Sequence, residues 1–175
     1  MLGVLPVIDE AARQEFSQAL RALAVGNISN DEFEDVRLPR TNTSDPAIEA
    51  LYKNGAWCLY SDLHEHKLSG RYALSAESKR HVARWVLFLR SGLPYEWPQL
   101  RGWRYILFLL ANAATLGLAN RAYQRKVSRS GDADVWPFRT REDYVAALSR
   151  PPYLQGPPNF AFQGKPLRGS PELGC

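Results

Sequence analysis

Apolar residues recur every three to four positions over much of the chain, which is the spacing that places side chains on one face of an α-helix. In the first such stretch, residues 9–25, the face consists of Phe16, Ala19, Leu20 and Leu23. Asp9 supplies an acidic residue for the first turn, and Gly26 suits the left-handed conformation that often ends a helix. The pattern therefore predicts a helix over residues 9–25.

Four further helices are predicted from the same spacing combined with capping residues. A short one begins with Asn30 as its N-cap. A longer one begins at Asp45 and continues as far as residue 68, unless Gly55 divides it into two. The remaining two begin after Ser75 and Thr140. No stretch alternates polar and apolar residues with the two-residue period of a β-strand.

The segment 98–129 is unusually apolar. The 16 residues from Tyr105 to Asn120 carry no charge. This run is shorter than the roughly 20 apolar residues that a membrane-spanning helix needs. A helix that is apolar on every side is otherwise found in the middle of a core. We therefore predict an all-α fold of five to six helices around this central apolar helix. The residues expected to be most deeply buried are Leu107, Leu110 and Ala114.

Both flanks of this apolar run resemble those of a membrane anchor, with Trp103 and Tyr105 at one end and cations at the other. The cations form a candidate anion-binding patch that consists of Arg121, Arg125, Lys126 and Arg129. They suit the negative end of a helix dipole, anionic lipid headgroups or phosphates. Four charges are few for a nucleic-acid partner, so peripheral contact with a membrane is the alternative to a solvated helix end.

The composition changes after residue 150. Six of the twelve prolines and four of the twelve glycines fall within residues 151–175, and such sequences favour extended conformations. We predict a single helical domain over residues 1–150, followed by an extended tail rich in proline and glycine over residues 151–175. In an alternative division, residues 1–37 form a separate helical hairpin.

The overall composition sets few limits on function. At 175 residues, 45% of them hydrophobic, the chain has room for one sizeable core. Its two cysteines are too few for a disulfide framework, and Cys58, within an apolar run, is expected to be buried. The first residues lack the basic start and long apolar middle of a secretory signal. The sequence predicts a cytoplasmic protein without a cofactor, with peripheral attachment at the inner membrane as the alternative.

Charge is unevenly distributed along the chain. Residues 1–50 hold nine acidic and four basic side chains, whereas the remainder holds nine acidic and eighteen basic ones. Such polarity suits docking to another molecule, for which an acidic helix with Phe33 as its apolar anchor is the candidate surface. The candidate partner-binding residues are Asp31, Glu32, Phe33, Glu34 and Asp35. In the alternative, Phe33 packs into the core against Phe16 and Leu20.

A group of potential metal ligands lies close together in the sequence: Asp62, His64, Glu65 and His66. On the predicted helix, the two histidines are rotated by about 200° from each other, so no bound metal is expected. Asp62 and His66 are four residues apart and share a helix face, where a carboxylate favours a protonated imidazole. These two residues are the candidate polar site.

Two weak resemblances concern other parts of the chain. The segment Gly131–Phe138 (GDADVWPF), which precedes a predicted helix, resembles a segment of small uncharacterised bacterial proteins, and Leu59–His66 resembles another part of the same group. This resemblance implies a bacterial origin and carries no information about function. Residues 26–34 resemble the turn of a short two-helix oligomerisation motif, which implies a homo-oligomer as an alternative to a monomer.

The small size, the charge polarity and the lack of a catalytic signature favour a non-enzymatic interaction protein with a protein partner. In its sharper form, this is an immunity or antitoxin-like protein that masks its partner. The first alternative is a membrane-associated accessory protein held by residues 104–129. The second alternative is a small enzyme centred on Asp62 and His66.

Overall fold

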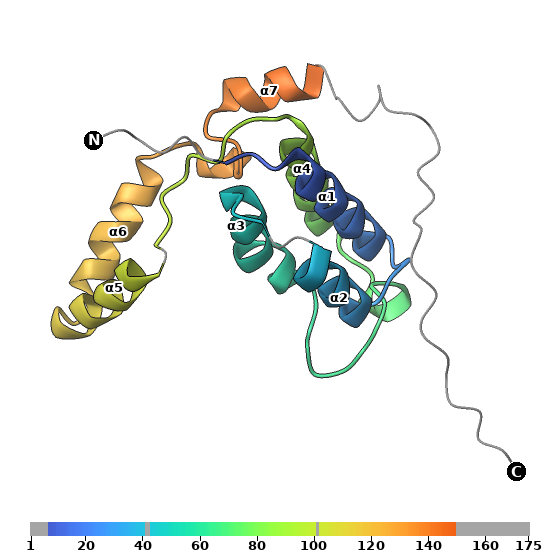
Figure 1. Ribbon diagram of the computed structural model, residues 1–175, viewed down its shortest axis with the longest axis horizontal. Helices are drawn as coiled ribbons and strands as arrows, with labels where there is room; N and C mark the ends of the chain where they lie inside the picture. Colours follow the sequence, from blue (N-terminus) through green and yellow to red (C-terminus); the bar gives the residue numbers. More distant parts are fainter. Residues whose placement is uncertain (1–6, 41–42, 101, 150–175) are drawn as a thin grey trace, which may run out of the picture.

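The computed structural model describes residues 7–40, 43–100 and 102–149, with side chains omitted at 36–40. Within these ranges the chain forms α-helices and short 3₁₀ helices and no β-strand, which confirms the all-α class (Figure 1). The α-helices are α1 (Glu10–Ala24), α2 (Asn30–Arg40), α3 (Pro46–Asn54), α4 (Ala76–Arg90), α5 (Trp103–Ala114), α6 (Leu118–Ser128) and α7 (Arg141–Ser149). The 3₁₀ helices are η1 (Ala56–Leu59), η2 (Gly70–Tyr72) and η3 (Ala133–Val135). The predicted tail lies outside the described residues.

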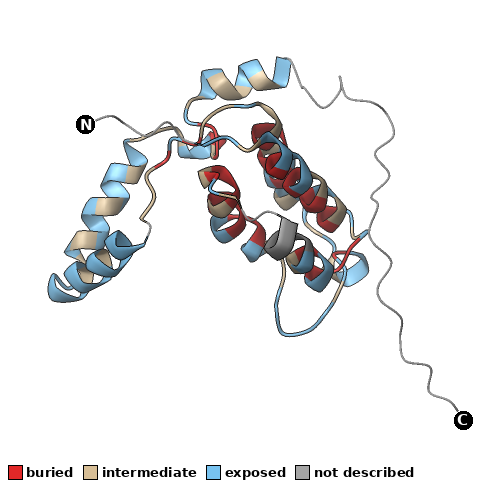
Figure 2. Cartoon of the chain, viewed as in Figure 1, coloured by how far each residue is buried: buried red, intermediate tan, exposed pale blue. Residues whose placement is uncertain are grey.

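The core lies where α1 to α4 meet, and we call these four helices the body. Helix α1 packs against α2, α3 and α4, and Figure 2 shows the buried residues gathered between these helices. The apolar face predicted for α1 is fully buried, as are Leu51 of α3 and Phe88 of α4 at 0% and 1% exposure. The apolar faces of α1 to α4 thus cover one another.

The helices begin largely at the predicted caps. The Asp9 carboxylate accepts a hydrogen bond from the Ala12 amide at 3.0 Å, and this bond lowers the pKa of Asp9. Ser75 caps α4 through the Ser78 amide, and Thr140 caps α7 through the Asp143 amide. These short-range contacts depend on neighbouring residues only, which is why the sequence predicts them.

Helix α2 begins one residue earlier than predicted, with Ser29 rather than Asn30 as its N-cap. The Ser29 hydroxyl accepts from the Glu32 amide at 3.2 Å, and the Glu32 carboxylate accepts from the Ser29 amide at 2.8 Å. This reciprocal pair is a capping box. The Asn30 side chain is instead buried, and it forms hydrogen bonds with the backbone of the loop at residues 61–66.

Helix α3 ends at Asn54, just before Gly55, the residue at which one alternative divided the predicted helix. A Cβ atom at Gly55 would lie 2.7 Å from the Leu51 carbonyl oxygen and 3.0 Å from the Trp85 ring, so only glycine fits there. The chain continues through η1 into an irregular segment, so the prediction of a helix that reaches residue 68 is wrong. Cys58 on η1 is exposed, which also corrects its expected burial, because no helix carries it into the core.

A buried ion pair joins the starts of α1 and α3. Arg13 donates to Asp45 through Nε at 2.6 Å and Nη2 at 3.1 Å, and through Nη1 to the Leu93 carbonyl oxygen at 2.7 Å. Asp45 also accepts from the Asp9 and Ala47 amides at 3.0 and 2.9 Å. Arg13 therefore holds three distant segments together from a buried position.

The segment before α7 attaches to the body through aromatic side chains. Val135 and Phe138 are buried, and the Phe138 ring lies 5.2 Å from Phe88. The Trp97 indole donates to the carbonyl oxygens of Pro137 and Phe138 at 3.0 and 3.2 Å. These contacts position α7 beside α4.

The prediction of a central apolar helix is wrong. Helices α5 and α6 form a hairpin that projects from the body (Figure 1), and Leu107 and Leu110 are 53% and 63% exposed. Ala114 is exposed as well. The core is filled by α1 to α4 together with the segments around Trp97 and Phe138, and α5 contributes no buried residue to it. Within the described ranges, no helix has the length and apolar character that crossing a membrane requires.

This correction changes the expected effect of substitutions in α5. Leu110→Ala should alter the free energy of unfolding by less than about 1 kcal/mol, because the side chain is already in water. Leu51→Ala, at a fully buried position, should cost about 2–5 kcal/mol through lost transfer energy and a cavity. Urea denaturation of both variants measures the difference, and similar losses for the two would show that α5 is part of the core.

Candidate functional site

The hairpin, defined here as residues 103–128, is held together along one face of each helix. The Phe108 ring of α5 lies 5.4 Å from Tyr123 of α6, and the Asn120 amide donates to the Asn112 side-chain oxygen at 3.0 Å. The Tyr123 hydroxyl donates to the Pro98 carbonyl oxygen at 3.0 Å, and Val127 packs against the core. These contacts join one end of the hairpin to the body. The turn between α5 and α6 lies at the opposite end.

The turn reverses the chain with residues in the left-handed region. Leu116 has φ of 48° and Gly117 has φ of 90°. Such angles are strained for leucine and ordinary for glycine. The Thr115 hydroxyl accepts from the Ala119 amide at 3.1 Å and so caps α6. The turn thus holds the Leu116 side chain in an exposed position.

The outward face of α5 is apolar throughout. At 100° per residue, its large side chains cover an arc of about 200° around the helix axis. The hairpin's apolar surface consists of Trp103, Tyr105, Ile106, Leu107, Leu109 and Leu110 on α5, which are 46–68% exposed, and of Leu116 and Leu118 at 94% and 61%. A continuous apolar surface of this kind marks a place where a folded protein binds something else.

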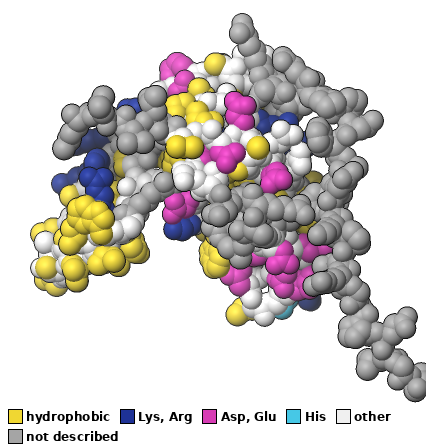
Figure 3. All heavy atoms as spheres, in the orientation of Figure 1, with side chains coloured by type: hydrophobic (Ala, Val, Ile, Leu, Met, Phe, Trp, Pro, Cys, Tyr) yellow, Lys and Arg dark blue, Asp and Glu magenta, His cyan; other side chains and the backbone are white. Residues whose placement is uncertain are grey.

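The outward face of α6 is basic. Arg121, Arg125, Lys126 and Arg129, the predicted anion-binding residues, are all exposed. The sequence between Glu96 and Asp132 has six basic residues and no acidic one. Figure 3 shows hydrophobic side chains over the far part of the hairpin and Lys and Arg side chains nearer the body. The structure thus brings the predicted cations next to an apolar surface that the sequence analysis had placed in the core.

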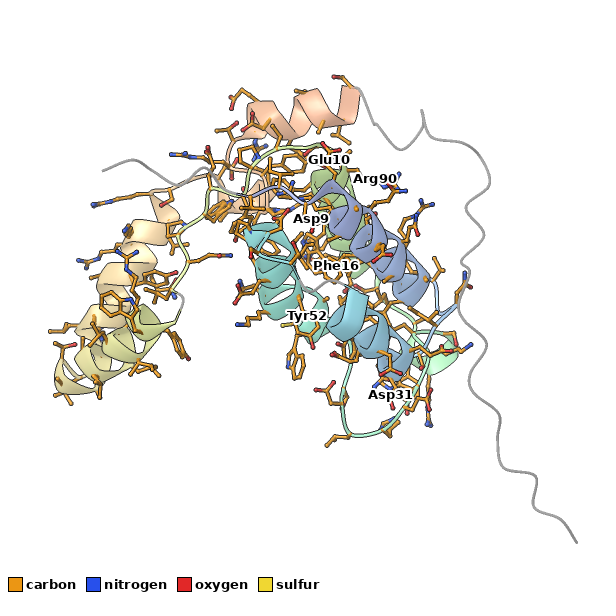
Figure 4. The ribbon with its side chains drawn as sticks, viewed as in Figure 1. Asp9, Glu10, Phe16, Asp31, Tyr52 and Arg90 are labelled. Carbon is orange, nitrogen blue, oxygen red and sulfur yellow. The ribbon has the colours of Figure 1, made fainter. Side chains whose placement is uncertain are left out.

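Phe33 is a core residue and not an exposed anchor for a partner. Its side chain is 0% exposed, and its ring centroid lies 5.9 Å from Phe16, 6.4 Å from Tyr52 and 6.1 Å from Tyr60. Figure 4 shows Phe16 and Tyr52 in the region where α1, α2 and α3 meet. The alternative in which Phe33 packs inward is therefore correct, because these aromatic residues close the core beneath α2.

The acidic residues around Phe33 have different surroundings. Glu34 accepts hydrogen bonds from the hydroxyls of Tyr52 and Tyr60. Burial and the bond to Glu34 raise the pKa of Tyr60 above its ordinary value. The remaining three acidic side chains of the predicted surface are exposed, namely Asp31, Glu32 and Asp35. The acidic surface therefore exists without an apolar residue at its centre.

The candidate polar site does not form as predicted. Asp62 and His66 lie in an irregular segment rather than on a helix, and within the described residues they form no ion pair with each other. His66 donates through Nδ1 to the His64 carbonyl oxygen at 3.0 Å. The two imidazole rings lie 5.0 Å apart, so the expectation that they diverge is wrong. In the described ranges, no three potential ligands are grouped to hold a metal.

Asn30 determines the path of this histidine segment. Its side-chain amide donates to the carbonyl oxygens of Ser61 and His64 at 3.3 and 3.2 Å, and its oxygen accepts from the His66 amide at 2.7 Å. The Asn30 side chain is 2% exposed. A polar residue at the start of a helix usually indicates an N-cap, so nothing in the sequence indicated that Asn30 would bond to a distant loop instead.

No protein-family model, curated protein or solved structure matches the chain. Function is therefore inferred from the surface that the chain itself presents.

Proposed function

We propose that this protein attaches peripherally to a lipid membrane through the α5–α6 hairpin. The proposal depends on a single observation, the apolar surface of the hairpin, which projects from a body whose own apolar faces are already covered. Leaving eight large apolar side chains in water is unfavourable, and their transfer to an apolar medium gives a large free-energy gain. A membrane supplies such a medium.

The shape of the apolar surface favours lipid over a protein partner. A partner helix covers one stripe of α5, whereas the exposed side chains spread over about 200° and continue across the turn. Lipid chains surround a helix and so cover such an arc. The 12 residues of α5 extend about 18 Å, which suits entry into one leaflet rather than passage through a hydrocarbon layer of about 30 Å.

Masking of a cationic partner by α2 receives less support. The acidic side chains of this helix are exposed, but Phe33 is part of the core and provides no apolar centre for an interface. Attachment through the hairpin matches the membrane-associated accessory protein that the sequence analysis held as its first alternative. In this arrangement the body remains in water and is held at the membrane surface.

Vesicle sedimentation tests the attachment. The wild-type chain should sediment with vesicles made of equal parts phosphatidylcholine and phosphatidylglycerol. Replacing two leucines at the turn end, Leu110→Ser with Leu116→Ser, should weaken binding by about tenfold or more, because each leucine loses its apolar transfer energy.

The matched control replaces two exposed apolar residues outside the hairpin, Val145→Ser with Leu148→Ser on α7, which are 56% and 50% exposed. This control should bind as the wild type does, and circular dichroism should show that both variants are folded. Wild-type protein that stays in the supernatant, or equal losses for the two double variants, would contradict attachment through the hairpin.

A further inference from the structure

We infer that the hairpin enters the membrane turn first and that the cations of α6 bind the headgroups of acidic phospholipids. This inference rests on the proposed membrane attachment and adds the lipid class and the orientation. It follows from how apolar, aromatic and basic side chains are distributed along the hairpin axis.

The turn end of the hairpin is apolar on both helices. Leu116 lies in the turn, Leu118 is the first residue of α6, and Leu110 is four residues before the end of α5. At a rise of 1.5 Å per residue, all three fall within about 6 Å of the turn along the axis. A hairpin that enters turn first therefore brings these three side chains to the acyl chains before any other part of the protein.

The cations lie mostly toward the body end. Arg121 is about 4.5 Å along α6 from its first residue, whereas Arg125, Lys126 and Arg129 are about 10–16 Å along it. A long arginine side chain extends back toward water while its stem stays in an apolar layer, which accommodates Arg121. When the turn is inserted, the other three cations therefore lie at the level of the lipid phosphates.

Aromatic residues support the same orientation. Trp103 and Tyr105 are in the first turn of α5, at the body end, and are 68% and 49% exposed. Indole and phenol rings favour the interface between headgroups and acyl chains, where an apolar ring and a polar group are both accommodated. At 1.5 Å per residue, these two residues lie about 14–17 Å from the end of α5, level with Arg125, Lys126 and Arg129, so the apolar turn is followed by one interfacial level that holds both aromatic and basic side chains.

The charge of the segment selects the class of lipid. Because no acidic residue lies between Glu96 and Asp132, nothing within the segment offsets its positive charge. Anionic headgroups attract each nearby cation, which increases membrane affinity by roughly fivefold per charge. Zwitterionic headgroups provide no such gain. The hairpin should therefore distinguish phosphatidylglycerol from phosphatidylcholine.

The first experiment compares vesicles of pure phosphatidylcholine with vesicles that contain phosphatidylglycerol, using the full chain. Wild-type protein should bind the anionic vesicles at least tenfold more tightly, and added salt should reduce the difference. Arg125→Glu with Lys126→Glu should remove this preference. The matched control, Lys79→Glu with Arg80→Glu, changes two exposed cations of α4 by the same charge and should retain it.

The outcomes separate the inference from the proposed function. Equal binding to both kinds of vesicle, still lost in the Leu110→Ser and Leu116→Ser variant, would overturn the lipid class and leave membrane attachment standing. Absence of binding to either kind would overturn both. If the Arg125→Glu and Lys126→Glu variant keeps the vesicle preference but loses binding to a single-stranded oligonucleotide, the cations serve nucleic acid and the inference is wrong.

A second experiment tests the orientation. An environment-sensitive fluorophore is attached to Leu116→Cys at the turn or to Ser128→Cys at the body end, in a chain with Cys58→Ser and Cys175→Ser. Anionic vesicles should shift the emission of the probe at position 116 to shorter wavelength and leave the probe at position 128 nearly unchanged. Equal shifts would indicate a hairpin that lies flat, and a shift at position 128 alone would indicate the opposite orientation; either would overturn turn-first entry.

Discussion

Replacing Arg13 with alanine should lower the free energy of unfolding by about 3–5 kcal/mol, because Asp45 would remain buried without its counter-ion. The two side chains are 1% and 0% exposed, so water cannot replace the lost partner. Arg13→Ala also removes the hydrogen bond to the carbonyl oxygen of the half-buried Leu93, which adds to the loss. Urea denaturation followed by circular dichroism measures the loss.

A second ion pair of the same chain provides the control. Lys53 and Glu49 pair at 2.8 Å on the surface of α3, with side chains 62% and 38% exposed. Lys53→Ala should change the free energy of unfolding by no more than about 0.5 kcal/mol, because solvent screens an exposed pair. A loss below about 1 kcal/mol for Arg13→Ala would mean that water reaches Asp45 and that the site is not closed.

Phe33→Ala should lower the free energy of unfolding by about 3–5 kcal/mol, the range for deleting a fully buried aromatic ring. The ring contacts aromatic side chains of α1, α3 and the segment after η1, so its removal leaves a cavity bounded by three parts of the body. Thermal denaturation should show a correspondingly lower melting temperature.

Leu63→Ala is the control for this substitution, because Leu63 is 91% exposed and lies on the nearby loop. Its melting temperature should match that of the wild type. If Phe33→Ala were equally stable, Phe33 would be an exposed residue available to a partner, and the masking of a cationic partner by α2 would again be the better explanation for the acidic surface.

The sequence by itself determined the helices whose signals are local. The apolar face of α1, the start of α4 at Ser75 and the start of α7 at Thr140 all agree with the structure. In each case, the residues that decide the conformation lie within one or two turns of one another, so spacing and capping chemistry suffice. The all-α class follows from the same signals.

The candidate site was predicted only in part. The sequence indicated an apolar run with a basic flank, and these are the two components of the hairpin surface. It did not indicate that the run bends at Leu116 and Gly117 into two helices. Apolar composition shows that a segment avoids water, but a protein core and a membrane satisfy this requirement equally, so composition cannot choose between them.

Contacts between distant residues were decided by the tertiary structure alone. The Arg13–Asp45 pair spans 32 positions, and the bonds from Asn30 to the histidine segment span 31 to 36. Local spacing carries no information about such partners, because they meet only after α1 to α4 have packed. The same holds for α5: tertiary packing filled the core with α1 to α4 and with segments around Trp97 and Phe138, and no residue of α5 is buried.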